Sequence, residues 1–399
     1  MINEKVGKHS KKMPNIKRNK KIKTKKEKTP EQIRKSKKRR IIILIIFVIL
    51  IIILGIYTAF SINNFKSLIE DMSTNKESII KDSSGNVIAE VGSEKLKEKL
   101  EFSEIPNNLK NAYVAIEDQR FYKHGGVDVK RTASATLSYV FHRGSSSYGG
   151  SSITQQLVKN LTGDSSSKIT RKFKEWKNAI AIESFMSKDE ILELYLNIIY
   201  VGPNVYGVEA GAQYYFDKPA KNLTLEECAF LAGINNSPNS YNPFNDTDNT
   251  EKINKRTKIV LSKMLELKYI NENEYNEAIQ KVDDGLKFKK GKNTTDNDVY
   301  SYHTDVLISQ AIDDISRKKH ISTVFATNYI NMSGLTIYST QDSSVQNAIE
   351  TEFEKSKYQL ASKNGGDSSQ AAMVIIDHKT GQVLRMCWRT RKKDYITLF

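Results

Sequence analysis

Apolar residues follow different patterns in different parts of this 399-residue sequence, and the longest apolar run lies near its beginning. Residues 41–60 read IIILIIFVILIIILGIYTAF, twenty residues without a charged side chain. As a helix, such a run rises about 30 Å, the thickness of a bilayer core, so we predict one transmembrane helix. A cleaved signal peptide would have a shorter apolar region ending in a small-residue cleavage site, and neither holds here. We therefore expect an uncleaved signal-anchor.

Helical periodicity dominates the middle of the chain, from Ile105 to about Ile279. Pro106 suits the start of a helix. Further helices are predicted over residues 168–186, 188–200 and 224–234. Strand patterns are fewer, and they predict a hairpin over residues 79–88, a strand over 334–340 and a hairpin-like end over 371–384. The predicted fold class is mainly α, with a small α/β piece at the C-terminus.

The net charge of +16 belongs almost entirely to the N-terminal tail. Residues 1–40 hold 18 Lys and Arg against 3 Asp and Glu, whereas the remaining 44 basic and 43 acidic residues nearly cancel. A folded nucleic-acid-binding surface would need its own basic excess, so we expect no nucleic-acid partner. Four basic residues, 37–40, directly precede the apolar run, and the positive-inside rule places them in the cytoplasm. The chain after Phe60 is then extracellular.

Candidate chemistry begins at Glu117 and Asp118, which end a predicted helix and precede Gly125 and Gly126. Two adjacent carboxylates beside glycines suit a site where a proton moves close to the backbone. Taken alone, the same pair also fits an ordinary solvated helix end.

Two further groups of polar residues follow. The first is a dense set of hydroxyl, amide and ammonium donors, which suits phosphate and sugar hydroxyls: Ser151, Ser152, Thr154, Gln155, Gln156, Lys159 and Asn160. The second opens a helix with Arg171, Lys172, Lys174 and Glu175, and cations beside a carboxylate can bind a pyrophosphate directly or through a metal ion. Arg171 and Glu175 are also spaced as an ordinary surface ion pair would be. The order of these groups fits glycosyl transfer from a diphosphate-activated sugar.

At these residues the chain resembles the family 51 glycosyltransferases, the peptidoglycan glycosyltransferase domain of class A penicillin-binding proteins. Five motifs occur in the family's order: EDQRFYKHGG at 117–126, GSSITQQLVKN at 150–160, RKFKE at 171–175, ILELYLN at 191–197 with the glycines and tyrosines after it, and 223–243. One motif alone is weak evidence, whereas five in order behind a signal-anchor are specific. The resemblance covers about residues 61–279, and continues more weakly over 334–377.

The resemblance implies a lysozyme-like fold and an inverting reaction that joins lipid II units into glycan strands and releases undecaprenyl diphosphate. Carried over by motif position, Glu117 is the general acid/base and Glu175 assists at the diphosphate. The cations that neutralise the leaving group are then Lys159, Arg171 and Lys174. The polar residues that bind substrate are Asp118, Ser151, Gln155 and Gln156. A divalent cation, Mg²⁺ or Mn²⁺, is an optional cofactor at the diphosphate, with no protein ligands assigned. Cell-wall synthesis or division proteins are candidate partners.

The expected organisation has six segments: 1–40 basic cytoplasmic tail, 41–60 signal-anchor, 61–99 stalk, 100–283 glycosyltransferase domain, 284–370 linker region and 371–399 a truncated start of a transpeptidase domain. Class A penicillin-binding proteins continue with a serine–lysine acylation motif. The S-x-x-K strings at Ser73, Ser165 and Ser316 are chance matches in stalk, loop and linker, so transpeptidase activity is not expected. The sequence after Leu384 suggests a truncation or frameshift of a longer gene.

Two alternatives to the glycosyltransferase remain open at this point. A muramidase-like hydrolase on the same fold would not need Lys159, Arg171 and Lys174, because no diphosphate leaves. A non-catalytic membrane-anchored scaffold would not need intact motifs at all.

Overall fold

The computed structural model describes residues 30–72, 76–92, 99–132, 150–163, 168–203, 205–291, 300–353, 355 and 371–389. Three stretches of the predicted segments lie outside the described residues: 1–29 of the tail predicted over 1–40, 292–299 and 356–370 of the linker, and 390–399 at the C-terminus. The chain divides into two compact units, residues 1–56 and 57–399. The described part of the first unit, residues 30–56, lies entirely in helix α1 (Pro30–Met72). Within the described part of the chain, no helix is both long and apolar enough to cross a membrane.

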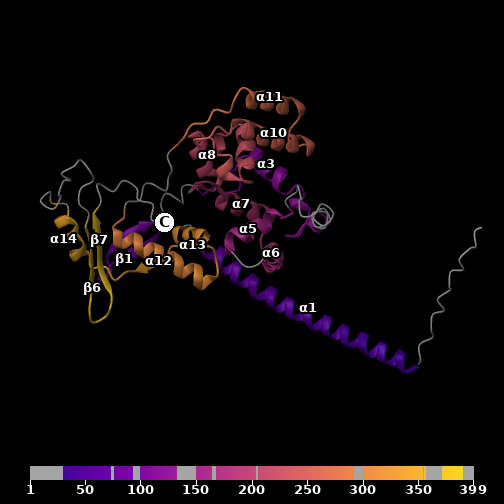
Figure 1. The fold of residues 1–399 in the computed structure, drawn as a ribbon, viewed down its shortest axis with the longest axis horizontal. Helices are drawn as coiled ribbons and strands as arrows, with labels where there is room; N and C mark the ends of the chain where they lie inside the picture. Colours follow the sequence, from indigo (N-terminus) through magenta and orange to yellow (C-terminus); the bar gives the residue numbers. More distant parts are fainter. Residues whose placement is uncertain are drawn as a thin grey trace, which may run out of the picture. The chain divides into compact units, whose positions relative to one another are not determined.

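The second unit is mainly helical, as predicted (Figure 1). Its central part contains α3 (Asn107–Glu117), α5 (Ile153–Thr162), α6 (Lys168–Glu183), α7 (Lys188–Ile198), α8 (Val208–Phe216), α9 (Leu225–Ile234), α10 (Thr250–Glu266) and α11 (Glu272–Asp283). The short 3-10 helices of the same region are η1 (Phe121–Lys123), η2 (Ala220–Asn222) and η3 (Pro238–Ser240). One apolar core joins these helices, and α9 lies at its centre with nine of its ten residues buried. Helix α9 packs against α3 and α10, and α5 packs against α6 and α7.

Four helices begin with reciprocal side-chain caps, which explains why they start where they do. The capping residue pairs are Ser152 with Gln155 at α5, Ser187 with Glu190 at α7, Thr224 with Glu227 at α9, and Asn271 with Glu274 at α11. In each, the side chain of the first residue accepts a bond from the backbone of the second, and the second returns one.

The predicted helix over 188–200 was too long at its C-terminal end. Helix α7 ends at Ile198, Ile199 is extended (φ −66°, ψ 137°), and Tyr200 begins β3 (Tyr200–Gly202). Strand β3 pairs with β4 (Val205–Tyr206) in an antiparallel hairpin. Apolar periodicity continues through Tyr200 because both elements bury residues in the same core, so the pattern could not mark the boundary.

The predicted hairpin over 79–88 is confirmed as β1 (Ser78–Lys81) and β2 (Val87–Val91), which pair antiparallel. A third strand, β5 (Thr336–Tyr338), pairs parallel with β1, so the sheet order is β2-β1-β5. Helices α12 (Tyr302–Lys319) and α13 (Thr323–Met332) pack beside this sheet. Segments predicted separately as stalk and linker thus share one sheet.

The C-terminal segments form a small layer of their own, drawn in yellow in Figure 1. Strands β6 (Ala371–Ile376) and β7 (Val383–Arg389) pair antiparallel, which confirms the hairpin-like end, and α14 (Ser343–Phe353) packs against β7. The contact of α13 with α5 connects this half of the unit to the helical core, and the pairing of β5 with β1 joins it to the hairpin of β1 and β2.

Candidate active site

Glu117 stands at the last residue of α3, and its carboxylate accepts two amide hydrogen bonds. Gln156 Nε2, on α5, donates to Glu117 Oε2 at 2.8 Å, and Asn235 Nδ2, at the end of α9, donates to Glu117 Oε1 at 3.0 Å. The residue is only partly buried. Three helices from distant parts of the sequence therefore converge on one carboxylate, and each of its oxygens keeps a lone pair for another donor.

Tyr195, on α7, closes these contacts into a ring. Its hydroxyl donates to Gln156 Oε1 at 2.9 Å and accepts from Asn235 Nδ2 at 3.1 Å. The side chain is fully buried. Burial first, and then the neighbouring Glu117 carboxylate, raise the pKa of Tyr195 well above its ordinary value, so the hydroxyl stays a proton donor. We call these four residues, Glu117, Gln156, Tyr195 and Asn235, the Glu117 ring.

Asp118, the next residue, has no exposed surface, and its carboxylate contacts other residues of the protein. Its Oδ2 accepts from the backbone N–H of Ile153, in the first turn of α5, at 3.0 Å and lies 2.9 Å from His124 Nε2. The Arg131 Nη1 lies 4.0 Å from Asp118 Oδ1 and also donates to the Glu117 carbonyl. Asp118 therefore fixes the start of α5 against the end of α3. Its predicted contact with substrate stays a prediction.

Glu175, on α6, occupies a different electrostatic environment. Its side chain is 4% exposed, with Arg171 Nε 3.3 Å from Oε1 and Lys172 Nζ bonded to Oε2. The same Lys172 ammonium donates to Ser151 Oγ at 2.8 Å, so it joins the second motif to the third. Two cations therefore face this buried carboxylate. Arg171 and Glu175 do form the i, i+4 pair that their spacing allows, but a buried one.

The remaining predicted site residues differ in burial and in their contacts. Gln155 is buried and its amide oxygen accepts from the Ser152 backbone at 2.8 Å as part of the α5 cap. Lys159 is exposed in the last turn of α5, and Lys174 is exposed on α6. The structure thus brings Gln156 to Glu117, and brings Ser151 and Arg171 to the network around Glu175. Gln155 and Lys159 have no described contact with the side chain of Glu117 or Glu175.

Three residues of these networks were not predicted as site residues. Tyr195 was interpreted as core, and it is buried, yet its hydroxyl completes the Glu117 ring. Lys172 stood among the cations of its motif, but nothing in the sequence marked its bond to Ser151. Asn235 lies in a turn-rich stretch where several asparagines occur, and the sequence gives no signal that distinguishes it.

Lys177, one turn beyond Lys174 on α6, is the one lysine of this helix with a large described change in acidity. Burial, and then repulsion from Lys174, lower the pKa of Lys177 to about 8. Part of its population is therefore neutral at mildly alkaline pH. The cationic surface of α6 consequently weakens as pH rises above 8.

The residues described around Glu117 and Glu175 do not build a metal site by themselves. Lys172 is bonded to Oε2 of Glu175, and Arg171 Nε lies 3.3 Å from Oε1 without a hydrogen bond to it. Within the described residues, no group of three His, Cys, Asp or Glu side chains could hold an ion together. Mg²⁺ commonly takes one or two carboxylates and completes its shell with substrate phosphates and water. The donor set here fits direct neutralisation of a phosphate by cations better than a resident ion.

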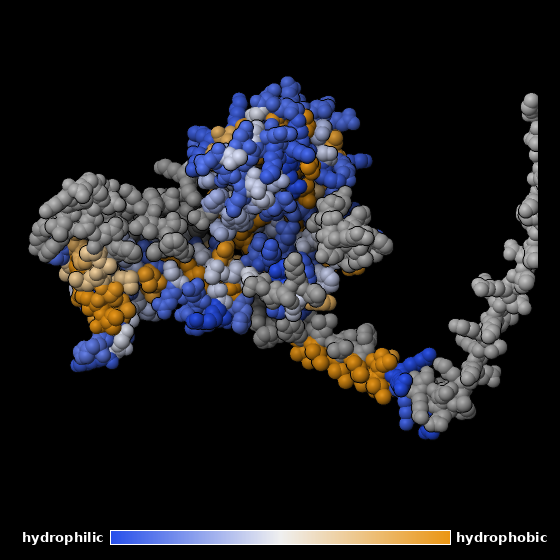
Figure 2. All heavy atoms as spheres, viewed as in Figure 1, coloured by the Kyte–Doolittle hydropathy of each residue, from blue (hydrophilic) through white to orange (hydrophobic). Residues whose placement is uncertain are grey.

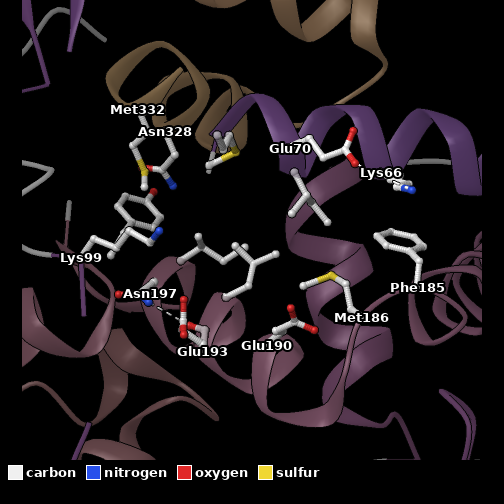
Figure 3. Close-up of a pocket in the computed structure, with 15 residues that line it drawn as sticks. Lys66, Glu70, Lys99, Phe185, Met186, Glu190, Glu193, Asn197, Asn328 and Met332 are labelled. Atoms are coloured by element: carbon white, nitrogen blue, oxygen red, sulfur yellow. Dashed lines mark hydrogen bonds and ion pairs between the residues drawn. The ribbon is translucent and has the colours of Figure 1, made fainter. Parts of the chain in front are cut away.

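A cavity of about 350 Å³ lies elsewhere in the second unit (Figure 3). Its walls come from the end of α1, the turn between α6 and α7, α7 itself and α13, and they include Met186, Met332 and Phe185. None of the nine predicted site residues lines it. Asn197, on its wall, is engaged by the backbone of Leu100, donating at 2.8 Å and accepting at 2.9 Å. The cavity is therefore separate from both carboxylate networks.

Comparison with known proteins now identifies the class to which this site belongs. Residues 84–265 match the family model described as Transglycosylase, and this part of the chain is a transglycosylase domain. The match contains both carboxylate networks, including Asn235.

The relatives place that domain in larger proteins. The chain is 36% identical over 347 residues to penicillin-binding protein 1A of Clostridium perfringens, a match that covers 83% of this chain and 51% of that protein. It is 33% identical over 329 residues to penicillin-binding protein 1A/1B of Bacillus subtilis, a match that covers 82% of this chain and 34% of that protein. The chain thus spans about half or less of the length of these relatives.

A crystal structure of penicillin-binding protein 1A from Haemophilus influenzae aligns with 73% of this chain and 32% of its own, at 21% identity and a TM-score of 0.30. A score this low does not establish a shared fold.

Proposed function

We propose that this chain is a peptidoglycan glycosyltransferase, which polymerises lipid II into glycan strands with release of undecaprenyl diphosphate. The observation that carries the proposal is the contrast between its two carboxylates. Glu117 is partly exposed and held only by uncharged amide donors, so it is free to take a proton. Glu175 is buried, with a cation beside each of its oxygens. Two carboxylates with different environments serve different roles in glycosyl chemistry.

In this proposal Glu117 accepts the proton of the acceptor sugar's 4-hydroxyl as that oxygen attacks the anomeric carbon of the donor. The second lone pair of each Glu117 oxygen remains available for this contact, while Gln156 and Asn235 hold the carboxylate in place. Removal of the proton as the bond forms is general base catalysis, worth about 10²–10⁴ in rate. The attacking oxygen and the leaving diphosphate lie on opposite faces of the sugar, so the anomeric centre inverts.

The leaving diphosphate gains negative charge as the bond to the anomeric carbon breaks. Arg171 and Lys172, on α6, are the described cations nearest Glu175, and Lys159 and Lys174 add exposed ammonium groups on α5 and α6. Cations placed where charge develops lower the barrier. Glu175 holds Arg171 and Lys172 in position. A hydrolase acting on finished glycan would have no use for this set.

We further propose that residues 41–60 anchor the protein and that the transglycosylase domain is extracellular. The sequence supports this through the uncharged run and the basic residues before it. The described side chains of residues 41–46 are also exposed, with fractions of 49–65%, and Figure 2 shows apolar residues gathered along this stretch of α1. Exposed isoleucines on every side of a helix favour burial in lipid.

The test is incubation of the detergent-solubilised full chain with labelled lipid II, and separately with preformed glycan strands. A glycosyltransferase lengthens lipid II into strands and leaves preformed glycan intact. Release of disaccharides from preformed glycan would instead establish a muramidase-like hydrolase. A folded protein that changes neither substrate would contradict both enzyme hypotheses and favour a scaffold. Addition of EDTA, then of Mg²⁺ or Mn²⁺, tests whether a divalent cation contributes at the diphosphate.

A further inference from the structure

The Asn235 side chain contacts Glu117 from the end of the buried helix α9. It is the C-terminal cap of α9, with helical backbone angles (φ −52°, ψ −30°). Nine of the ten residues of α9 are buried, so the end of this helix has little freedom to move. Its Nδ2 donates to Glu117 Oε1 at 3.0 Å and to the Tyr195 hydroxyl at 3.1 Å.

The chemistry of the ring fixes the orientation of both amides. An ionised carboxylate accepts hydrogen bonds only, so both amides must turn their NH₂ groups toward Glu117. Tyr195 holds Gln156 in this orientation by donating to Gln156 Oε1. A flipped amide at either position would place an oxygen against the carboxylate. The orientation of the Glu117 carboxylate is therefore set by the ring as a whole.

We propose that Asn235 is a positioning residue for the transfer reaction, which holds the Glu117 carboxylate toward the acceptor hydroxyl. This inference rests on the proposed function. Without Asn235, Glu117 Oε1 loses its described amide donor and the carboxylate can rotate about its terminal bond, because that torsion is broad. Misplacement of a catalytic group by about 1 Å costs on the order of a hundredfold in rate.

A purely structural role for Asn235 makes a different prediction from a positioning role. Aspartate has the shape of asparagine, so Asn235→Asp would keep the volume of the side chain at the end of α9. It would also place a second carboxylate about 3 Å from Glu117, where like charges disfavour two ionised groups. A positioning role thus predicts that Asn235→Asp is the more damaging substitution, and a structural role predicts the reverse.

The experiment compares kcat and KM for lipid II polymerisation by the full chain in detergent, with melting temperatures measured alongside. Asn235→Ala is expected to lower kcat by at least about tenfold with KM within about twofold, and Asn235→Asp is expected to lower kcat further. The matched control is Asn222→Asp, the same change at an exposed asparagine of η2, which is expected to match wild type.

Each outcome has a defined reading. Wild-type kcat in Asn235→Asp, or a loss that appears in KM alone, would overturn the positioning role. If Asn235→Asp fails to fold, Asn235→Ala is the deciding variant, since it removes the donor without adding charge, and wild-type kcat in that variant overturns the role. An inactive wild-type protein would instead overturn the proposed function itself.

Discussion

The start of α5 supports both carboxylate networks, and its cap offers a stability test that can be worked from the structure. Ser152 is 1% exposed and makes two kinds of contact. Its hydroxyl accepts from the Gln155 backbone at 3.1 Å as the helix cap, and it donates to the backbone carbonyl of Gly126. Ser152→Ala removes both.

The expected cost is the sum of the two losses. A lost N-cap costs about 1 kcal/mol. A buried carbonyl left without its donor costs about 1–2 kcal/mol more. Ser187 provides a matched control, because it caps α7 with the same type of box but is exposed and has no described bond to a buried carbonyl. Ser187→Ala should therefore cost about 1 kcal/mol, against about 2–3 kcal/mol for Ser152→Ala.

Thermal unfolding of the full chain in detergent measures the difference. For a domain of this size, 1 kcal/mol shifts the melting temperature by about 2–4 °C, so Ser152→Ala should melt about 2–8 °C below Ser187→Ala. Equal melting temperatures for the two variants would refute the reasoning, because they would show that the bond to Gly126 contributes nothing beyond a cap.

Three further predictions concern charge and reactivity. Lys172→Met should reduce the rate of lipid II polymerisation more than Lys123→Met does, because only Lys172→Met removes a cation from buried Glu175. Equal rates for the two variants would contradict this prediction. The pKa of Lys177 is lowered to about 8 and its unfolded value is near 10.4, so its contribution to stability rises with pH between about 8 and 10. NMR of ¹³C-methylated lysines should show one titration near pH 8 that Lys177→Met removes, and its persistence in that variant would contradict the assignment. Fluorescent penicillin should not label Ser316, because its hydroxyl donates to the backbone carbonyl of Ile321 at 2.7 Å, and covalent labelling at this serine would refute that.

The sequence predicted those parts of the fold that depend on local pattern. The hairpin over 79–88 follows from two short apolar runs around a turn, and α9 from ten residues bounded by a capping box and a turn-rich stop. Parallel pairing of β1 with β5 could not be predicted in this way. Ile79 pairs with Thr336, and neither strand's pattern specifies a partner so distant in the chain.

In the candidate site, too, the sequence predicted what depends on local pattern and missed what depends on tertiary packing. Motifs identified Glu117, Gln156 and Glu175 because their residue types and spacing are distinctive. The contacts that hold these residues come from other helices and depend on how the core packs. Asn235 reaches Glu117 only because buried α9 lies against α3, a relation that no local pattern in the sequence contains.

The central claim is that Glu117 is the group that moves the proton in glycan polymerisation. The most direct measurement compares strand formation from labelled lipid II by wild type, Glu117→Gln and Glu277→Gln, the last being the same change at an exposed glutamate of α11. Glutamine keeps the shape of the side chain but cannot take the proton. We predict long strands from wild type and Glu277→Gln, and a loss of at least about a hundredfold in Glu117→Gln with an unchanged melting temperature. Strand formation by Glu117→Gln at the wild-type rate would contradict the account.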